Sequence, residues 1–321
     1  MSNRNPRDDP AVRLAAQTLT QHFTDKSNQP IRTPFYITQL QVLYERDFFP
    51  WVIADAIRIL TEDKALTQFR KIHLPYPDQI PNVRDIVFVT NSHAYAEKPD
   101  LVKIHAQTTA ELVNRYSNPE ITKAVGNQLE GLVKYELRAN QFKITGLHTN
   151  QFKDKTWTQT GHNLDIVAQH NSGNLNIGVE VKNTLDLMEP KEIDTKIDMC
   201  HFLGLIPVFA IRWMKPYIDC IRNQGGYSWV FKTQIYPPGF EALTKLLYDK
   251  LSFTTRSDSQ GTPLQFPVTV RTDIPEKPAT ALTKWVAASL QNPPQRNPTA
   301  RCRGSRETDD EDITNADVYV Q

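Results

Sequence analysis

Hydrophobic side chains recur every three or four positions over several long stretches of the chain, a spacing typical of amphipathic helices. Residues 10–24, 35–60 and 99–116 have this pattern. The second stretch contains a short polar break near Arg46-Asp47, which predicts two helices instead of one. The N-terminal third of the chain is therefore predicted to be mainly helical.

Two strands are predicted after this pair of helices, at residues 65–74 and 84–89, with the Pro75–Pro81 loop between them. The order helix, helix, two-stranded wing is that of a winged helix-turn-helix, which often places its second helix in the DNA major groove. That second helix is mostly apolar here, and Arg58 is its plain candidate for a DNA contact. Packing in a core or against a partner protein therefore has as much support as DNA reading. We expect a winged-helix-like domain over 35–98.

The segment 163–182 predicts two strands joined by a tight turn. Gly173 tolerates positive φ, and asparagines flank the turn as turn formers. With a two-residue loop, counting outward along both strands places Asp165 directly opposite Glu180. Side chains alternate along a strand, so Lys182 shares this face and the valines between these residues point toward a core.

Two carboxylates and an ammonium on one strand pair indicate a possible metal site. Carboxylates at cross-strand distance repel each other, and a hard divalent cation bound by oxygen ligands removes that repulsion. A lysine beside them can orient a water molecule or neutralise a developing oxyanion. A lone Glu-x-Lys on a strand is more often a solvated face or an ion pair, so this interpretation depends on the paired acid and on the surrounding elements.

These residues resemble the signature of the PD-(D/E)xK nuclease superfamily. Asp165 corresponds to the aspartate of the motif, and the run Glu180-Val181-Lys182 corresponds to its (D/E)xK part. The chain departs from the pattern at Leu164, where the motif has proline. The resemblance implies an α/β fold of the restriction-endonuclease-like type, which is a mixed sheet flanked by helices.

The resemblance extends to the elements on both sides of the motif. Residues 126–144 are similar to the opening helix and first strand of the family, and 190–205 and 206–213 are similar to its next helix and strand. It covers about 119–236. We therefore expect a nuclease-like domain over 119–252, preceded by the mainly helical winged-helix-like domain.

The resemblance also implies roles for individual residues. Asp165 and Glu180 would hold Mg²⁺, with the Val181 carbonyl as a further ligand and with Mn²⁺ as a substitute metal. Glu130, on the opening helix, would complete the acidic set directly or through water. Lys182 would orient the attacking water or stabilise the charge that develops on the phosphate. The expected catalytic residues are these three acids and this lysine.

Several residues near the motif are weaker candidates for nucleic-acid contacts. Lys153, Lys155 and Trp157 lie in a polar stretch, predicted to be a loop, directly before the first motif strand. The lysines could hold a phosphate backbone and the tryptophan could stack on a base, although core packing is the commoner fate of a tryptophan. Lys196 lies off the apolar stripe of its helix, where it either assists at the site or is an exposed charge.

The remaining parts of the chain have weaker patterns. Residues 1–34 form an N-terminal helical segment, and 99–118 are predicted to be a linker helix. Residues 253–291 are predicted to be an irregular extension with a short helix at 282–290. The composition of 292–321 turns to Pro, Asn and Arg and then to acidic residues, which predicts a disordered tail.

Bulk properties limit the environment and the partners. The chain has 321 residues and a formal net charge of +1. This balance excludes a uniformly basic surface, so contact with DNA has to come from local patches. Three cysteines without metal-site spacing suit a reducing cytoplasm, and no apolar run approaches the length that crosses a bilayer. We expect a soluble cytoplasmic protein without membrane insertion.

The motif and the resemblance together predict a metal-dependent DNA endonuclease, a deoxyribonuclease that hydrolyses phosphodiester bonds in host defence or in DNA repair. The alternative is a winged-helix DNA-binding or protein-interaction module whose nuclease-like domain is not catalytic. DNA is the expected partner, and a homodimer or a complex with another protein would form through the N-terminal module.

Overall fold

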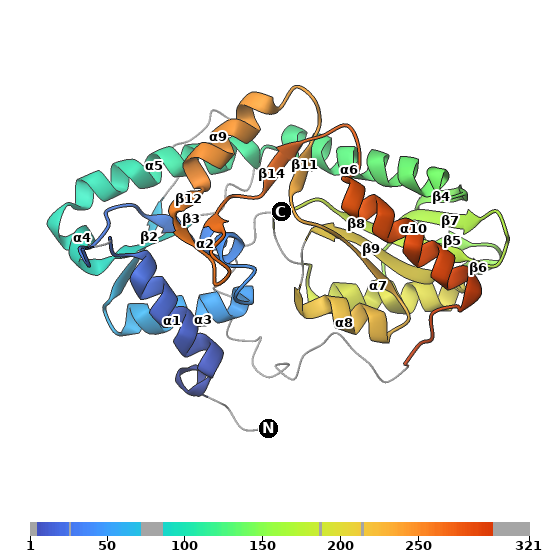
Figure 1. Cartoon of the computed structure of the whole chain (residues 1–321), viewed down its shortest axis with the longest axis horizontal. Helices are drawn as coiled ribbons and strands as arrows, with labels where there is room; N and C mark the ends of the chain where they lie inside the picture. Colours follow the sequence, from blue (N-terminus) through green and yellow to red (C-terminus); the bar gives the residue numbers. More distant parts are fainter. Residues whose placement is uncertain (1–4, 26, 72–85, 186–187, 213–214, 298–321) are drawn as a thin grey trace. The chain divides into compact units, whose positions relative to one another are not determined.

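The computed structural model describes residues 5–25, 27–71, 86–185, 188–212 and 215–297 of the chain, which form a mixed α/β structure (Figure 1). Contacts within the chain divide it into two units. The first unit contains the residues up to Asn118 together with Lys245–Pro267, and the second contains Pro119–Thr244 and the residues from Val268 onward. None of the described helices is long and apolar enough to cross a membrane.

The first unit is mainly helical and includes a small antiparallel sheet of order β1-β3-β2. Its elements are a short 3-10 helix at Pro6–Asp8, α1 (Pro10–His22), β1 (Phe35–Tyr36), α2 (Ile37–Leu43), α3 (Pro50–Glu62), β2 (Leu66–Lys71), β3 (Ile86–Asn91), α4 (Ser92–Glu97), α5 (Pro99–Tyr116), the part of α9 (Glu241–Leu251) from Lys245 onward, β12 (Phe253–Ser257) and β13 (Pro263–Leu264). The predicted pair of helices with a break is present as α2 and α3. The first two residues of that predicted stretch are instead a strand.

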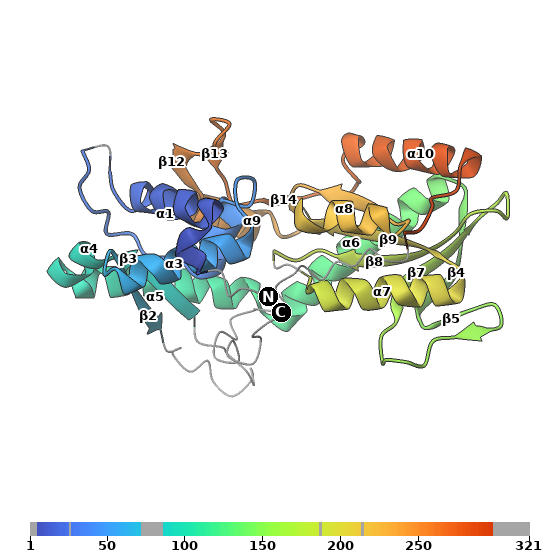
Figure 2. The ribbon, with the colours of Figure 1, turned by 90° about the horizontal axis from the view of Figure 1, so that it is seen from below.

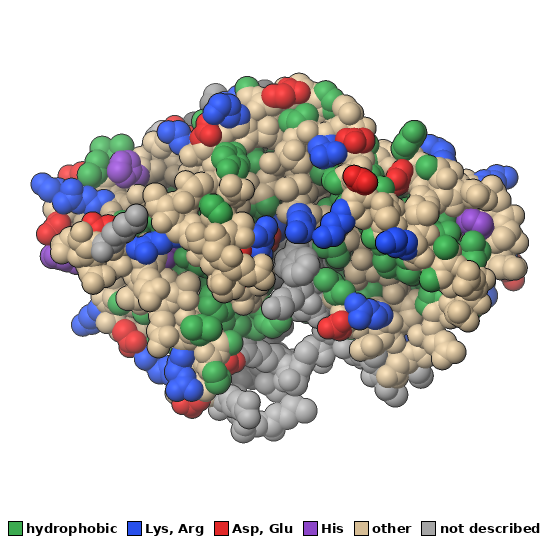
Figure 3. Space-filling model, in the orientation of Figure 1, with side chains coloured by type: hydrophobic (Ala, Val, Ile, Leu, Met, Phe, Trp, Pro, Cys, Tyr) green, Lys and Arg blue, Asp and Glu red, His purple; other side chains and the backbone are tan. Residues whose placement is uncertain are grey.

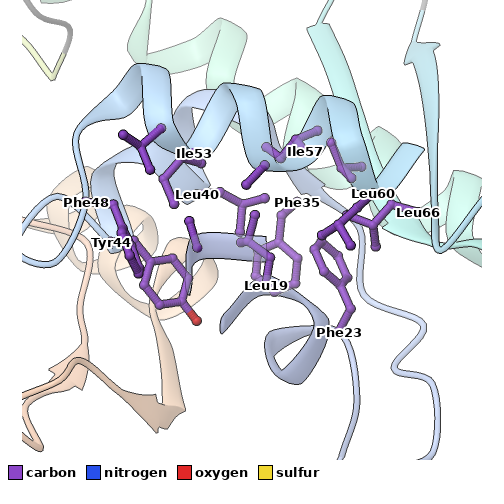
Figure 4. Packing of buried hydrophobic residues seen from close by; sticks show 14 of the residues in the cluster. Leu19, Phe23, Phe35, Leu40, Tyr44, Phe48, Ile53, Ile57, Leu60 and Leu66 are labelled. Carbon is purple, nitrogen blue, oxygen red and sulfur yellow. The ribbon is translucent and has the colours of Figure 1, made fainter. Parts of the chain in front are cut away.

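The core of the first unit lies among α1, α2 and α3 (Figure 4). Leu19, Leu40 and Ile53 come from the three helices and are fully buried, because each helix carries its apolar side chains on one face. Asp9 caps the start of α1 by accepting a hydrogen bond from the backbone N–H of Ala11 at 2.8 Å.

A distant segment of the chain completes this core. Phe253 and Leu264, from β12 and β13, pack against the same apolar cluster. The side-chain amide of Gln39 donates to the Leu251 carbonyl at 2.9 Å, and Arg46 forms an ion pair with Asp258 at 3.2 Å. These C-terminal residues were predicted to belong to the nuclease-like domain and to an irregular extension. In the structure they form two strands and the end of a helix, which pack with the N-terminal unit.

The predicted linker helix belongs to the first unit, and the predicted loop between the wing strands lies outside the described residues. The helix predicted as a linker, α5, packs against β2 and β3 of the first unit and buries Val102, Ala106 and Val113. The predicted Pro75–Pro81 loop and the ends of the two wing strands fall within 72–85, which lies outside the described residues.

The second unit is built around a five-stranded mixed sheet of order β10-β9-β8-β7-β4. Strand β7 is antiparallel to both of its neighbours, β4 and β8, whereas β8, β9 and β10 are parallel to one another. Its elements are α6 (Pro119–Ala139), β4 (Phe142–Thr149), β5 (Gln151–Phe152), β6 (Lys155–Thr156), β7 (Leu164–His170), β8 (Asn176–Lys182), α7 (Pro190–Leu203), β9 (Ile206–Arg212), α8 (Lys215–Asn223), β10 (Tyr227–Phe231), β11 (Gln234–Tyr236), β14 (Val268–Val270) and α10 (Glu276–Gln291).

Helices cover both faces of this sheet. Side chains of α6 and α10 share one apolar cluster with Val179 and Val208, whereas α7 and α8 pack on the other face against Phe209 and Ile211. Figure 2 shows α10 and α7 on opposite sides of the strands. The strand residues alternate between the two clusters because both faces are buried. Gly178 lies under α7, where an added Cβ would be 2.7 Å from both Cys200 Sγ and Leu164 Cδ1.

The buried side chain of Asn183, directly after β8, ties three elements of the second unit together. Its amide nitrogen donates to the carbonyls of Val125 at 2.7 Å and Ile235 at 2.6 Å. Its amide oxygen accepts from the backbone N–H of Ile235 at 2.9 Å. One side chain therefore satisfies three backbone groups in the interior.

The end of the described chain is more regular than predicted. α10 begins six residues before the short helix expected at 282–290, and its Leu282 and Val286 are buried against the sheet. Most of the predicted disordered tail, residues 298–321, lies outside the described residues. At its start, the Asn297 N–H donates to the Asn223 carbonyl at 2.9 Å.

Candidate metal site

The two motif strands pair in the predicted register. Ile166 lies opposite Val179, and the ladder continues to Gln169 opposite Asn176. Extending the ladder by one residue brings Asp165 opposite Glu180, which is the predicted register. The predicted two-residue loop is instead a four-residue turn at 171–174, because the next pairing bond runs from the His170 N–H to the Leu175 carbonyl at 2.8 Å. Gly173 has a φ of +79°, which an L side chain rarely adopts, and its N–H closes the turn onto the His170 carbonyl at 2.8 Å.

Asp165 is half-buried at the start of β7. Its Oδ2 atom accepts a hydrogen bond from the backbone N–H of Val181 at 2.7 Å, which ties the side chain to the neighbouring strand. Burial raises the pKa of this carboxyl, and the hydrogen bond from Val181 and the charge of Lys196 oppose the increase. The negative charge of Glu130 raises it further, so the two acids are close enough to interact.

Glu180 is the most deeply buried acid of the motif, with 6% of its surface exposed. Burial, followed by the charge of Asp165, raises the pKa of this carboxyl to about 7. Lys196 acts in the opposite direction through its charge and its hydrogen bond. A buried carboxylate of this kind is stabilised by any cation that reaches it.

Lys196 lies within the site, which corrects the alternative of an exposed charge. The residue is 6% exposed, and its Nζ lies 2.6 Å from Glu180 Oε2. The same ammonium donates to the main-chain carbonyl of Asn163. An inward helix face is normally recognised by its apolar residues, and a lysine is not expected on it. Lys196 is nevertheless buried on the inward face of α7 because it has a carboxylate partner there.

Lys182, the lysine of the motif, has a different environment. Its Nζ lies 3.5 Å from Glu192 Oε1 on α7, and its side chain is 36% exposed, compared with 7% for Lys196. Its contact is therefore with an acid outside the motif. The geometry brings Lys196, and not Lys182, into contact with the predicted metal carboxylate.

Glu130 approaches the site from α6 through His148, a residue that sequence analysis did not single out. His148 Nε2 lies 3.5 Å from Glu130 Oε1, and its Nδ1 lies 3.7 Å from Asp165 Oδ1. Glu130 also forms an ion pair with Lys134 at 3.0 Å. His148 was missed because β4 continues to Thr149 through a bulge that interrupts the alternation of the strand, within a stretch predicted as a loop.

The weaker nucleic-acid candidates separate into buried and exposed residues. Trp157 is 3% exposed, and its ring N–H donates to Thr160 at 2.9 Å, so it is a core residue and is not available to stack on a base. Lys153 and Lys155 lie on the β5–β6 hairpin. Lys153 lies over the Phe152 ring at 5.2 Å, and Lys155 donates to the Phe202 carbonyl at 3.0 Å.

Arg58 lies on the outer side of α3, where it pairs with two acids of its own helix. Its distances are 3.0 Å to Glu62 and 3.5 Å to Asp55. On the face shown in Figure 3, lysine and arginine side chains are interspersed with acidic ones. Neither observation indicates a broad basic surface on this face.

The donor set fits a hard divalent cation, although rearrangement is needed. Among the described residues, no three His, Cys, Asp or Glu side chains already form a group that could hold a metal ion. Asp165 and Glu180 nevertheless supply carboxylate oxygens on neighbouring strands, and each has a pKa raised by burial. A divalent ion between them would offset the repulsion that contributes to the increase at Glu180.

Comparisons of the chain with models of protein families, with curated proteins and with solved structures find no match. Functional assignment therefore depends on the residues and geometry of the chain itself.

Proposed function

We propose that this protein is a metal-dependent DNA endonuclease and that its second unit is a restriction-endonuclease-like domain of the PD-(D/E)xK type. The observation that carries the proposal is the proximity of Asp165 and Glu180 at adjoining ends of two antiparallel strands, where burial raises the pKa of both carboxyls and a buried lysine contacts Glu180. Such a set is costly in a purely structural role, because one ammonium and one backbone N–H offset only part of the cost of burying two neighbouring carboxylates.

The order of elements supports the same proposal. A helix bearing Glu130 precedes the strands, the two acids lie on antiparallel neighbours, and a helix leads from the second of them to a parallel strand. This is the arrangement that the sequence resemblance implied over about 119–236. The site lies where the covering helix α7 meets the ends of β7 and β8.

In the proposed reaction, Asp165 and Glu180 hold Mg²⁺ or Mn²⁺ with the Val181 carbonyl as a further ligand, and Glu130 contributes directly or through water. The bound ion would supply charge stabilisation at the scissile phosphate and lower the pKa of the attacking water. The backbone N–H of Val181 fixes the orientation of the Asp165 carboxylate. Lys153 and Lys155 are placed on an exposed hairpin that can contact the phosphate backbone.

The proposal is tested by incubating the full chain with linear, circular, branched and single-stranded DNA, in Mg²⁺, in Mn²⁺ and in EDTA. Cleavage in either metal and none in EDTA is expected for one or more of these substrates. Asp165→Asn keeps the shape and an acceptor for the Val181 N–H but removes the charge, so it should abolish cleavage. Lys245→Met, which changes an exposed lysine on α9 that pairs with Asp249, is the control that should cleave normally. Cleavage by Asp165→Asn equal to wild type would refute the assignment.

A second candidate, a protein-interaction module at the N-terminus, is favoured by α3. Its outer face presents Trp51, which is 37% exposed and stacks on Phe49 at 4.6 Å, and the single arginine there is held by acids. A DNA-reading helix normally exposes several polar and basic residues. Trp51→Ala that reduces self-association in sedimentation, without changing DNA affinity, would support this second function.

A further inference from the structure

Lys196 is bonded as a metal cation would be. Its ammonium contacts a carboxylate oxygen of Glu180 and the main-chain carbonyl of Asn163, in a place where 7% of the side chain is exposed. Carboxylate and carbonyl oxygens are the ligands that hard cations take in proteins. The residue therefore occupies an oxygen-lined cation position between the beginning of β7 and the end of β8.

We propose that the Lys196 ammonium takes the place of a second metal ion, so that the site binds one divalent cation per chain. The inference rests on the proposed metal-dependent function and adds the number of metal ions to it. Lys196 is a positioning residue in this scheme, because it acts through Glu180 and not on the substrate.

The hydrogen bonds leave one oxygen of each carboxylate without a donor in the described part of the chain. Lys196 engages Oε2 of Glu180, and the N–H of Val181 engages Oδ2 of Asp165. The other oxygen of each carboxylate, Oε1 and Oδ1, accepts no hydrogen bond from the described residues. The imidazole of His148 lies 3.7 Å from Asp165 Oδ1, and that side chain is 62% exposed and can move aside.

The balance of charges at the site also supports one bound metal ion. Glu130 is paired with Lys134 at 3.0 Å, so Asp165 and Glu180, when ionised, carry the two remaining negative charges, and Lys196 offsets one of them. One divalent ion then leaves a small positive excess, which a DNA phosphate can balance. A second divalent ion beside the ammonium would meet strong repulsion, because two such charges at about 4–5 Å interact by several kcal/mol at the dielectric of a partly buried site.

The test counts Mn²⁺ ions bound to the full chain without DNA, from the loss of the free Mn²⁺ signal in electron paramagnetic resonance and by titration calorimetry. The wild type should bind one ion. Lys196→Met removes the charge but keeps most of the volume, so it should still bind one ion, at least about tenfold more tightly because a repulsion is removed. Lys196→Ala also opens the position, so it should bind a second ion.

Lys191→Met is the matched control. It removes an exposed lysine of the same helix, and we expect one bound ion with an affinity within about threefold of wild type, because solvent and salt screen that charge. A thermal melt of each variant establishes that it is folded. If Lys196→Ala does not fold, the affinity of Lys196→Met decides the question.

Two results overturn the inference and leave the proposed function standing: two ions bound to the wild type, or stoichiometry and affinity unchanged in both Lys196 variants. A wild type that binds no Mn²⁺ would instead remove the metal-dependent function, and the inference with it. The readout is binding, so each outcome is informative even if the correct DNA substrate is not among those tested.

Discussion

The raised pKa of Glu180 makes the stability of the metal-free protein depend on pH. In the unfolded chain this carboxyl titrates near its ordinary value of 4.5, and in the folded protein near 7. Because the folded state holds the proton more tightly, the stabilising contribution is complete below pH 4.5 and is lost as the pH rises through 7. Glu180→Gln, which cannot titrate, should remove this part of the pH dependence.

The size of the effect follows from the shift. A difference of 2.5 pKa units between 4.5 and about 7 corresponds to about 3 kcal/mol of unfolding free energy. Somewhat less than a third of it is already lost at pH 5, because the unfolded carboxyl is partly ionised there. Between pH 5 and pH 8 the wild type should therefore lose about 2–3 kcal/mol more stability than Glu180→Gln.

The assay is urea unfolding of both proteins at pH 5 and pH 8 in EDTA, with the free energies extrapolated to water. The comparison between the two proteins cancels titrating groups that they share. Saturating Mg²⁺ at pH 8 should restore stability to the wild type, since binding to the folded state adds to its unfolding free energy. Equal pH dependence in the two proteins would refute the reasoning and show that Lys196 keeps Glu180 ionised at little cost.

Three further outcomes are expected. In urea titration, Asn183→Ala should reduce the unfolding free energy by about 3 kcal/mol or more, because buried backbone groups lose their hydrogen-bond partners. The control Asn176→Ala should cost less than about 1 kcal/mol, because the amide oxygen of Asn176 is already buried without a partner. Gly178→Ala should lower stability by about 1–3 kcal/mol through the close contacts of its new Cβ, and a melting temperature equal to wild type would contradict this. Glu130→Gln should reduce Mg²⁺-dependent cleavage less than Asp165→Asn does, because it approaches the site through an intervening imidazole; complete loss in both would reverse this ranking.

The strand pair was predictable because its information is local. Turn-forming residues between the strands indicate where the hairpin reverses, and the four-residue turn at 171–174 gives the same register as the predicted two-residue loop. The main helices of the N-terminal part were predictable for a similar reason, since their apolar spacing is repeated over several turns.

Lys196 and His148 could not be assigned in this way. The inward face of α7 was inferred from apolar residues alone, and a buried lysine is recognised only once its carboxylate partner on another strand is known. His148 lies beyond a bulge that shifts the alternation of β4, so the period of the strand no longer indicates where its side chain points. Both are long-range effects, which the sequence pattern does not contain.

The packing of Lys245–Pro267 with the first unit could not be predicted from the sequence either. Its short strands carry no strong alternation, and the ring partners of Phe253, which are His22 and Phe35, lie more than two hundred residues earlier in the chain. The contacts that complete this core are therefore among the most distant in the molecule.

That distance has a consequence for synthesis of the protein on the ribosome. The chain up to Asn118 emerges first, but its core lacks Phe253 and Leu264 until the whole intervening unit has been translated. At ordinary elongation rates this leaves apolar surface uncovered for many seconds. A nascent chain that stops before Pro267 leaves the first unit without its last strands and the second without α10. Premature termination anywhere in this region therefore damages both halves of the protein at once.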